Sequence, residues 1–112
     1  GDALHTAHFS IGSGTRLALE DVIALVKALK AHDFSLPEAL PAYQEARKPV
    51  VEKIVRAANA SADWYENFAS HMTQDPWRFA HAYLQRSGRI TPERLALIAP
   101  EFAAGLAARG LT

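Results

Sequence analysis

The sequence predicts an all-α fold, and three observations support this. Apolar residues recur at steps of three and four along most of the chain, which is the spacing of one helical face. Prolines and cap residues mark the starts of several helices. No segment shows a sustained two-residue alternation of apolar and polar side chains, so no β-strand is expected. The 112 residues are enough for one domain at most.

The first expected helix covers about Gly14 to Lys30. Its apolar residues are spaced so that they form one continuous stripe along the helix. They are Leu17, Ala18, Val22, Leu25, Val26 and Leu29. A short break at residues 32–34 should end this helix.

Two further helices are expected in the middle of the chain. Ser35 can cap free backbone donors, Pro37 has a φ suited to a first turn, and Glu38 completes a capping box, so a helix should begin here. Pro49 lacks a backbone donor, so we expect this helix to end or kink near it. A third helix, the longest, should cover about residues 50–72, where apolar residues again follow helical spacing.

In the last part of the chain, the sequence predicts shorter helices whose first residues can be identified. Asp75-Pro76 and Thr91-Pro92 each combine a cap with a first-turn proline. Gly88 should stop the first of these helices, and Pro100 should interrupt the second before a last turn or two that end near Gly110. An aromatic set is expected to form the core between helices, with an interface as the second choice: Trp64, Tyr65, Phe68, Trp77, Phe79 and Tyr83.

Composition excludes several function classes. Lys plus Arg number 12 and Asp plus Glu number 12, so no net charge attracts nucleic acid or an anionic membrane. The chain has no cysteine, which fits a reducing compartment, and we expect the protein to be cytoplasmic. No segment has the length of apolar residues that a membrane span needs. The chain begins at Gly1 and its methionine is Met72, so we expect it to be a piece of a longer protein.

The segment before the first helix is the candidate binding site. Gly12 and Gly14 lead into a helix N-terminus, where backbone N–H groups lack partners and the helix dipole is positive. Such a place binds electron-rich groups, and glycine lets a flat or anionic ligand approach the backbone. A Gly-Ser-Gly segment before a helix is more often a plain loop, so the spacing alone favours a loop over a binding site.

A family resemblance favours the binding site. The stretches GDALH at residues 1–5, GSG at 12–14 and ALEDVIAL at 18–25 resemble, in this order, the second flavin-binding motif of single-component FAD-dependent aromatic hydroxylases. About the first 30 residues carry the resemblance. It implies that the whole protein is an α/β FAD-binding monooxygenase and that this chain is a helical C-terminal fragment of it. Residues 1–31 would hold the flavin motif and its helix, and residues 35–112 the C-terminal helices of a single helical fragment.

The resemblance also implies roles for particular residues. Asp2 would hydrogen-bond the ribityl chain of FAD. His8 and Phe9 would lie in the vicinity of the flavin and the substrate. The backbone amides beside the pyrimidine edge of the flavin would be those of Gly12, Ser13, Gly14 and Thr15. No catalytic residue can be assigned.

The sequence also departs from the family pattern. Leu4 stands where alanine is usual, His8 and Phe9 where the family has prolines, and Arg16 in place of asparagine. Within this family, the segment HTAHFSIGSGT at residues 5–15 is most similar in sequence to hydroxylases that act on salicylyl-CoA or 2-aminobenzoyl-CoA. The resemblance therefore implies an aromatic acid, carried as a coenzyme A thioester, as the substrate.

The implied reaction uses NADH or NADPH to reduce FAD, and O2 as the source of the oxygen placed on the aromatic ring. The chain contains no strand followed by GxGxxG, which would receive the ADP part of FAD. We therefore expect this chain to be inactive without the N-terminal FAD and substrate portion. Without that portion, the apolar stripe of the first helix should be exposed and favour homo-oligomers.

Alternative functions remain open. The chain could be a helical interaction or dimerisation module in which the glycine-rich start is only a loop. His5 and His8 are three residues apart, but no cysteine or converging carboxylates accompany them, so no metal site is predicted. Glu20 and Asp21 are interpreted as compensation of the helix dipole in the first turn and as part of the helix pattern of the family that the chain resembles, rather than as an acid/base pair.

Overall fold

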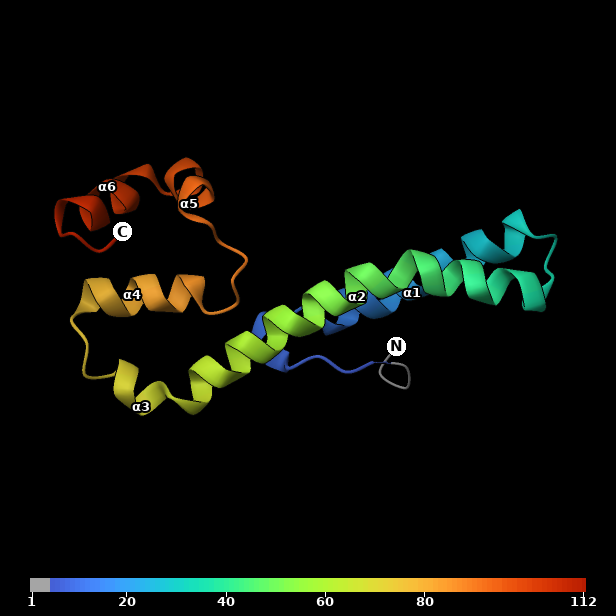
Figure 1. Cartoon of the computed structure of the whole chain (residues 1–112), viewed down its shortest axis with the longest axis horizontal. Coiled ribbons are helices and arrows are strands. Elements are labelled where there is room, and N and C mark those ends of the chain that lie inside the picture. Colours follow the sequence, from blue (N-terminus) through green and yellow to red (C-terminus); the bar gives the residue numbers. More distant parts are fainter. Residues whose placement is uncertain (1–4) are drawn as a thin grey trace. The chain divides into compact units, whose positions relative to one another are not determined.

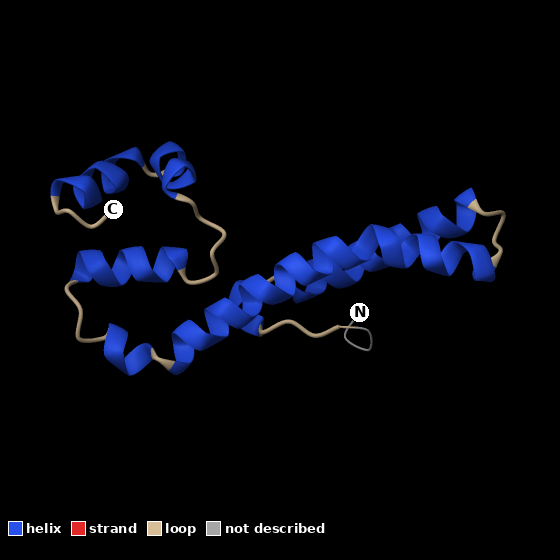
Figure 2. Ribbon diagram, in the orientation of Figure 1, coloured by secondary structure: helices blue, strands red, loops and turns tan. Residues whose placement is uncertain are grey.

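The computed structural model describes residues 5–112, and throughout this range the regular elements are helices (Figure 2). The all-α prediction is confirmed. In chain order the elements are a 3-10 turn η1 (Phe9–Ile11), α1 (Gly14–Ala31), α2 (Leu36–Glu66), α3 (Phe68–His71), α4 (Pro76–Gln85), α5 (Pro92–Ile98) and α6 (Pro100–Ala108). The chain divides into two compact units, one up to Asn59 and one from Ala60 onward. Within the described residues, no helix combines the length and apolar character of a membrane span.

The first unit is a hairpin of α1 and the part of α2 that precedes residue 60, lying side by side (Figure 1). The expected break at residues 32–34 is confirmed. Asp33 and Phe34 take the left-handed φ values of 50° and 61°, and the Phe34 N–H donates to the Leu29 carbonyl at 2.8 Å. This hydrogen bond closes the end of α1 and reverses the chain direction.

The two helices of the hairpin bury few apolar side chains. Leu17 of α1 is buried, as are Ala39, Ala57 and Ala58 of α2. Much of the predicted stripe on α1 remains accessible. Two members of the stripe, Val22 and Val26, are exposed. Leu19 and Ile23, which the prediction did not include, are also exposed and continue this face at helical spacing. The expectation of exposed apolar residues on this stripe is confirmed for Val22 and Val26, whereas self-association is not tested.

The prediction of a helix end at Pro49, with a separate helix after it, is wrong, because α2 runs without interruption past Pro41 and Pro49 to Glu66. The alternative of a kink near Pro49 stays a prediction. A proline inside a helix removes a hydrogen bond and costs about 3 kcal/mol. Residues on both sides of Pro49 are buried in the first unit, with Arg47 before it and Ala57 after it. Packing and ion pairing of the flanking turns therefore outweigh the local preference of proline.

The predicted long helix up to about Met72 also ends earlier than expected. Asn67 interrupts it: its side-chain amide donates to the Asp63 carbonyl at 2.9 Å, and its φ and ψ are −95° and 18°. An asparagine side chain that bonds to the backbone competes with the helical hydrogen bonds. The chain then resumes as the short helix α3.

The helix starts of the second unit are as predicted. The Asp75 carboxylate accepts hydrogen bonds from the N–H groups of Trp77 and Arg78, and the Thr91 hydroxyl accepts one from the N–H of Arg94. These contacts satisfy donors that a helix start leaves free. Gly88 and Gly110 both have φ of 65°, in agreement with their predicted role after helix ends.

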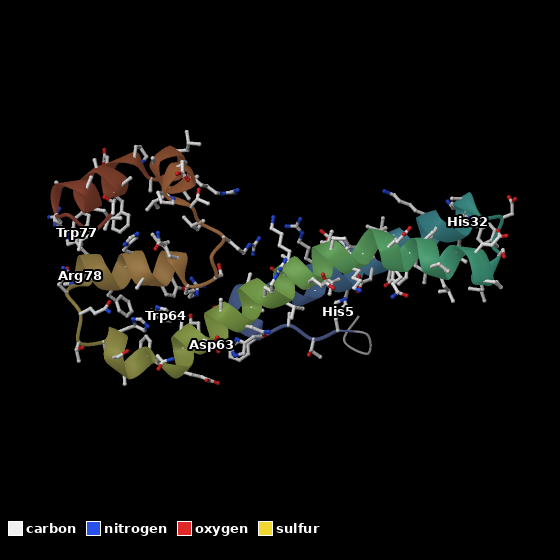
Figure 3. All side chains as sticks on the ribbon, viewed as in Figure 1. His5, His32, Asp63, Trp64, Trp77 and Arg78 are labelled. Atoms are coloured by element: carbon white, nitrogen blue, oxygen red, sulfur yellow. The ribbon has the colours of Figure 1, made fainter. Side chains whose placement is uncertain are left out.

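An aromatic core holds part of the second unit together, as predicted. The Trp64 ring stacks on His71 with centroids 4.6 Å apart, and four other rings lie against it edge-on. These rings belong to Tyr65, Phe68, Phe79 and Tyr83, with centroids between 5.2 and 5.8 Å from that of Trp64. The Trp64 side chain is labelled in Figure 3.

Trp77 packs elsewhere than with this cluster. Its ring stacks on Phe102 at 5.3 Å and lies beneath the Arg109 guanidinium at 3.8 Å. The α-carbon of Gly105 faces the same ring so closely that an added Cβ would lie 2.5 Å from two of its carbons. Trp77 therefore joins α4 to α6, and the contact requires a residue without a side chain at position 105.

Candidate functional site

The segment before α1 is organised by short-range contacts. The Nδ1 atom of His8 lies 2.8 Å from the Ser10 hydroxyl and accepts a hydrogen bond from the Ser10 N–H at 3.3 Å. The His8 ring stacks on Phe9, with centroids 4.5 Å apart and an interplanar angle of 26°. Phe9 is 86% exposed. The two residues predicted to lie near the flavin thus form one stacked pair whose outer ring is open to solvent.

Gly12 gives this segment its turn into the helix. Its φ of 63° is in the left-handed region, where glycine is favoured. The Gly12 N–H donates to the Phe9 carbonyl at 2.9 Å, so this amide already has a partner. A ligand would therefore meet the amides of the residues that follow, which open α1 and have no partner within the helix itself.

These residues lie at an open pocket. Gly12, Gly14 and Thr15 line it together with Ala7, Phe9 and Ala18. A Cβ built on Gly12 or Gly14 would meet no atom within 4 Å, so the space in front of both backbones is free of described atoms. The structure brings the predicted glycines, Thr15 and Phe9 around one space. Ser13 precedes α1 as its N-cap residue, without a side-chain capping bond. Asp2 lies outside the described residues.

A network of ion pairs joins the segment before α1 to the two helices of the hairpin. Asp21 of α1 is 3% exposed. Its carboxylate accepts a hydrogen bond from Nε of Arg47 at 2.9 Å and lies 2.7 Å from Nε2 of His5. Nη1 of Arg47 also reaches Glu20 at 3.4 Å, and Arg16 pairs with Glu20 at 2.7 Å. Figure 3 labels His5, which approaches the hairpin from the N-terminal segment.

The electrostatics of this network favour ionised carboxylates. Burial alone would raise the pKa of Asp21, but hydrogen bonds, among them those from Arg47 and His5, lower it to about 2. The hydrogen bond from Arg16 lowers the pKa of Glu20. Asp21 is therefore a permanently charged structural group at neutral pH. It holds the segment that carries His5 against the helix hairpin.

This result corrects the interpretation of Glu20 and Asp21. Neither residue lies in the first turn of α1, which contains no acidic residue, so compensation of the helix dipole there is not their role. The sequence analysis also missed Arg47 as a buried partner. A signal was present, because Arg47 stands in helical register with the apolar residues Tyr43, Val51 and Ile54. A charged residue on an apolar helix face implies a buried ion pair.

Other candidate sites receive less support from the structure. Among residues 5–112, no group of three or more histidine, cysteine or acidic side chains is placed to hold a metal ion. His5 is engaged with Asp21, and His8 with Ser10, so each has a different partner. The two histidines therefore have different contacts: one bonds to α1, and the other bonds within the turn before α1.

Comparisons with known proteins identify relatives of the chain. It is 47% identical over 89 residues to the salicyloyl-CoA 5-hydroxylase of a Streptomyces species, a match that covers 78% of this chain and 17% of that protein. It is 55% identical over 65 residues to the 3-hydroxy-4-methyl-anthranilyl-(aryl-carrier protein) 5-monooxygenase of Streptosporangium sibiricum, covering 58% of this chain and 18% of that protein. It is 41% identical over 63 residues to the FAD-dependent urate hydroxylase of Mycolicibacterium vanbaalenii, covering 56% of this chain and 16% of that protein.

The matches span only a small part of these relatives, between 16% and 18% of their length. No protein-family model matches the chain. No solved structure matches it either. The resemblance found in the sequence is nevertheless confirmed, because relatives that are named hydroxylases and monooxygenases match more than half of this chain.

Proposed function

Because the chain is homologous to part of these flavin-type hydroxylases and monooxygenases, we propose that it is the C-terminal part of an FAD-dependent monooxygenase that hydroxylates an aromatic acid. The observation that carries the proposal is the placement of Gly12, Gly14 and Thr15 around one open pocket at the start of α1. A glycine-rich segment with this geometry presents backbone donors and a positive helix end to an electron-rich ligand.

The residues of this pocket are compatible with a flat, electron-rich ring system. No described atom occupies the space in front of Gly12 and Gly14, and the exposed Phe9 ring offers an aromatic surface at the same pocket. When bound, FAD would supply the redox chemistry that activates O2. Ser13, Gly14 and Thr15 would donate backbone hydrogen bonds to the pyrimidine edge of the ring system, and Asp2 would bond the ribityl chain.

The rest of the segment would orient these donors. The His5 contact with Asp21 fixes one end of the segment to α1, and the bond between Gly12 and Phe9 fixes the turn at the other end. His8 and Phe9 lie between these two points. In this proposal they limit access of water and substrate to the flavin.

The proposed substrate is an aromatic acid held as a thioester, with NADH or NADPH as reductant, in the cytoplasm. Support comes from two relatives, whose names give a salicyloyl-CoA and an anthranilyl-carrier protein as what they act on. Both are ring systems with an electron-donating substituent on a thioester carrier. We propose that this chain alone has no hydroxylase activity, because its described residues supply neither a sheet nor a site for the ADP part of FAD.

A segment exchange tests the proposal. The matching segment of the Streptomyces salicyloyl-CoA 5-hydroxylase is replaced by this chain, and bound FAD and NAD(P)H-dependent hydroxylation are measured. We expect the chimaera to retain FAD and to hydroxylate. A folded chimaera without FAD would contradict the proposal.

A pair of glycine variants tests the pocket within the same chimaera. Gly14→Asp places a carboxylate in the first turn of α1, where it stabilises the helix but repels the electron-rich edge of the flavin. We expect bound FAD or hydroxylation to fall at least tenfold. The control is Gly110→Asp, which makes the same chemical change at an open left-handed position. Equal behaviour of the two variants would contradict the assignment of the pocket.

A second candidate function is a helical interaction module, favoured by the exposed apolar residues on α1. Leu19, Val22, Ile23 and Val26 are between 41% and 62% exposed, and they follow the spacing of one helix face. If this face joins two copies, sedimentation should show a dimer that Val22→Lys dissociates. A monomer at all accessible concentrations would exclude dimerisation as the function.

A further inference from the structure

A small pocket in the second unit is lined by three arginines. It lies where the segment between α4 and α5 turns, has a volume of about 250 Å3, and is lined by Leu84, Arg86, Ser87, Arg89, Ile90 and Arg94. None of these lining residues is acidic. The pocket is separate in sequence from the candidate flavin segment, and neither the resemblance nor the proposed function accounts for it.

The backbone around this pocket is fixed by capping contacts. Gly88 takes a φ of 65°, and its N–H donates to the Gln85 carbonyl at 2.8 Å. The Thr91 hydroxyl accepts a hydrogen bond from the Arg94 N–H at 3.2 Å at the start of α5. The turn that carries Arg89 is therefore held at both ends.

One arginine of the pocket is also held in place by its side chain. Nη1 of Arg86 donates to the Tyr83 carbonyl at 2.8 Å, and its guanidinium lies 4.0 Å from the centre of the Tyr83 ring. Contacts of this kind restrict a side chain that would otherwise lose much rotamer freedom on binding a ligand. Arg86 therefore forms a preorganised wall of the pocket.

Among the described residues, no partner neutralises the charges of the other two arginines. Within residues 5–112, the side chains of Arg89 and Arg94 have neither a hydrogen bond nor an ion pair. Like charges that line one small space repel each other, and an anion between them removes that repulsion. The guanidinium group matches the geometry of phosphate oxygens and binds them with paired hydrogen bonds.

We propose that this pocket binds a phosphate group of the carrier to which the aromatic acid is attached as a thioester. This step rests on the proposed function. Coenzyme A and the phosphopantetheine arm of a carrier protein both contain a phosphate ester next to the pantetheine chain, so they share this chemistry. A pocket of about 250 Å3 is below the roughly 300–1,000 Å3 typical for a whole small ligand. Contact is therefore made with one anionic group, and the aromatic ring lies outside the pocket.

Calorimetric titration of the chain tests this proposal without flavin. The probes are coenzyme A, phosphopantetheine, pantetheine without phosphate, and inorganic phosphate. We expect coenzyme A and phosphopantetheine to bind and pantetheine not to bind. Arg89→Gln and Arg94→Gln should each raise the Kd at least tenfold. Arg56→Gln removes the same charge from an exposed position on α2 in the first unit, and it should leave the Kd unchanged.

The outcomes separate the possible sources of the phosphate. Equal Kd values for coenzyme A and phosphopantetheine support contact with the phosphate that both carriers share. A Kd at least tenfold lower for coenzyme A supports contact with its adenosine phosphates. If inorganic phosphate bound as tightly as coenzyme A and phosphopantetheine, the assignment of the ligand to a thioester carrier would be overturned. Tight binding of pantetheine, no binding of any phosphate probe, or equal effects of the three variants would overturn the pocket itself.

The two proposals fail in different experiments. The variants Arg89→Gln and Arg94→Gln lie at exposed positions, and circular dichroism should show unchanged helix content. A chimaera that holds FAD and hydroxylates, combined with a chain that binds no phosphate probe, would reject this inference and leave the proposed function standing. A chimaera without FAD, combined with arginine-dependent binding of phosphopantetheine, would reject the flavin proposal alone.

Discussion

The two units of the chain are held together by different forces. The first unit has few buried apolar side chains, and a buried ion pair between Asp21 and Arg47 joins its two helices. The second unit gathers aromatic rings around Trp64 and Trp77. The stabilisation by a buried ion pair depends on pH and on the presence of both partners, whereas the stabilisation by packed aromatic rings depends on their contact area. The comparison teaches that helical units of one chain can be stabilised by different interactions and should therefore respond differently to acid and to side-chain removal.

The largest expected effect comes from removing the central ring of the second unit. Trp64 is 9% exposed and contacts five rings, counting that of His71. Trp64→Ala should lower the free energy of unfolding of this unit by about 4 kcal/mol, through lost burial and an unfilled cavity. Urea unfolding followed by near-ultraviolet circular dichroism measures it. A loss below about 1 kcal/mol would show that the aromatic cluster is not the core of the unit.

The next largest effect should come from breaking the buried ion pair. Asp21→Asn keeps the size of the side chain but removes the buried counter-charge of Arg47, which keeps its longer contact with Glu20 at 3.4 Å. We expect the first unit to lose about 3 kcal/mol, since removal of one partner of a buried ion pair is strongly destabilising. Amide hydrogen exchange in α1 and α2, measured by mass spectrometry, reports this unit separately. The double variant Asp21→Asn with Arg47→Met should recover stability, and no recovery would show that the pair is not what joins the helices.

Acid should weaken the first unit through Asp21. The pKa of Asp21 in the folded protein is about 2, compared with its ordinary value of 3.8. Because the folded pKa is the lower one, the stabilisation is complete above pH 3.8 and is lost as the pH falls to about 2. This shift corresponds to about 2 kcal/mol. Exchange rates of α1 amides should therefore rise between pH 4 and pH 2 more in the wild type than in Asp21→Asn, after correction for intrinsic rates.

The smallest effect is expected at the outer edge of the same network. Arg16 bonds to Glu20 at 2.7 Å, but its side chain is 75% exposed. Exposed ion pairs four residues apart on a helix contribute about 0.3–0.5 kcal/mol. Arg16→Gln should therefore shift the unfolding midpoint only slightly, and 1 M salt should remove the difference from the wild type. If Arg16→Gln destabilised the unit as much as Asp21→Asn, the solvent exposure of an ion pair would not determine how much that pair contributes to stability.

Much of the fold could be predicted from the sequence, because local signals decide where its helices begin. Asp75-Pro76 and Thr91-Pro92 cap α4 and α5 as expected. The predicted helix end at Pro49 was wrong, because the burial of Arg47 and Ala57 on either side of it depends on contacts between residues distant in sequence. Asn67 ended α2 through a side-chain bond that the apolar spacing does not reveal.

The candidate site was predictable in part. The glycine-rich segment before α1 is present at the expected position and faces an open pocket, because glycine spacing and helix starts are local properties. The pairing of the Gly12 amide with Phe9 and the contacts of Asp21 with His5 and Arg47 were not predicted. These contacts join residues up to 26 positions apart, and their geometry follows only once the hairpin has formed.

The contact between Trp77 and Gly105 has an evolutionary consequence. A Cβ at position 105 would lie 2.5 Å from the indole ring, so the two positions share one volume. We expect the two positions to vary together among homologous chains, with alanine or a larger residue at 105 accompanied by a smaller residue at 77. Two substitutions that are each harmful alone would then be neutral together, and the order in which they arise would constrain how this helix pair diverges.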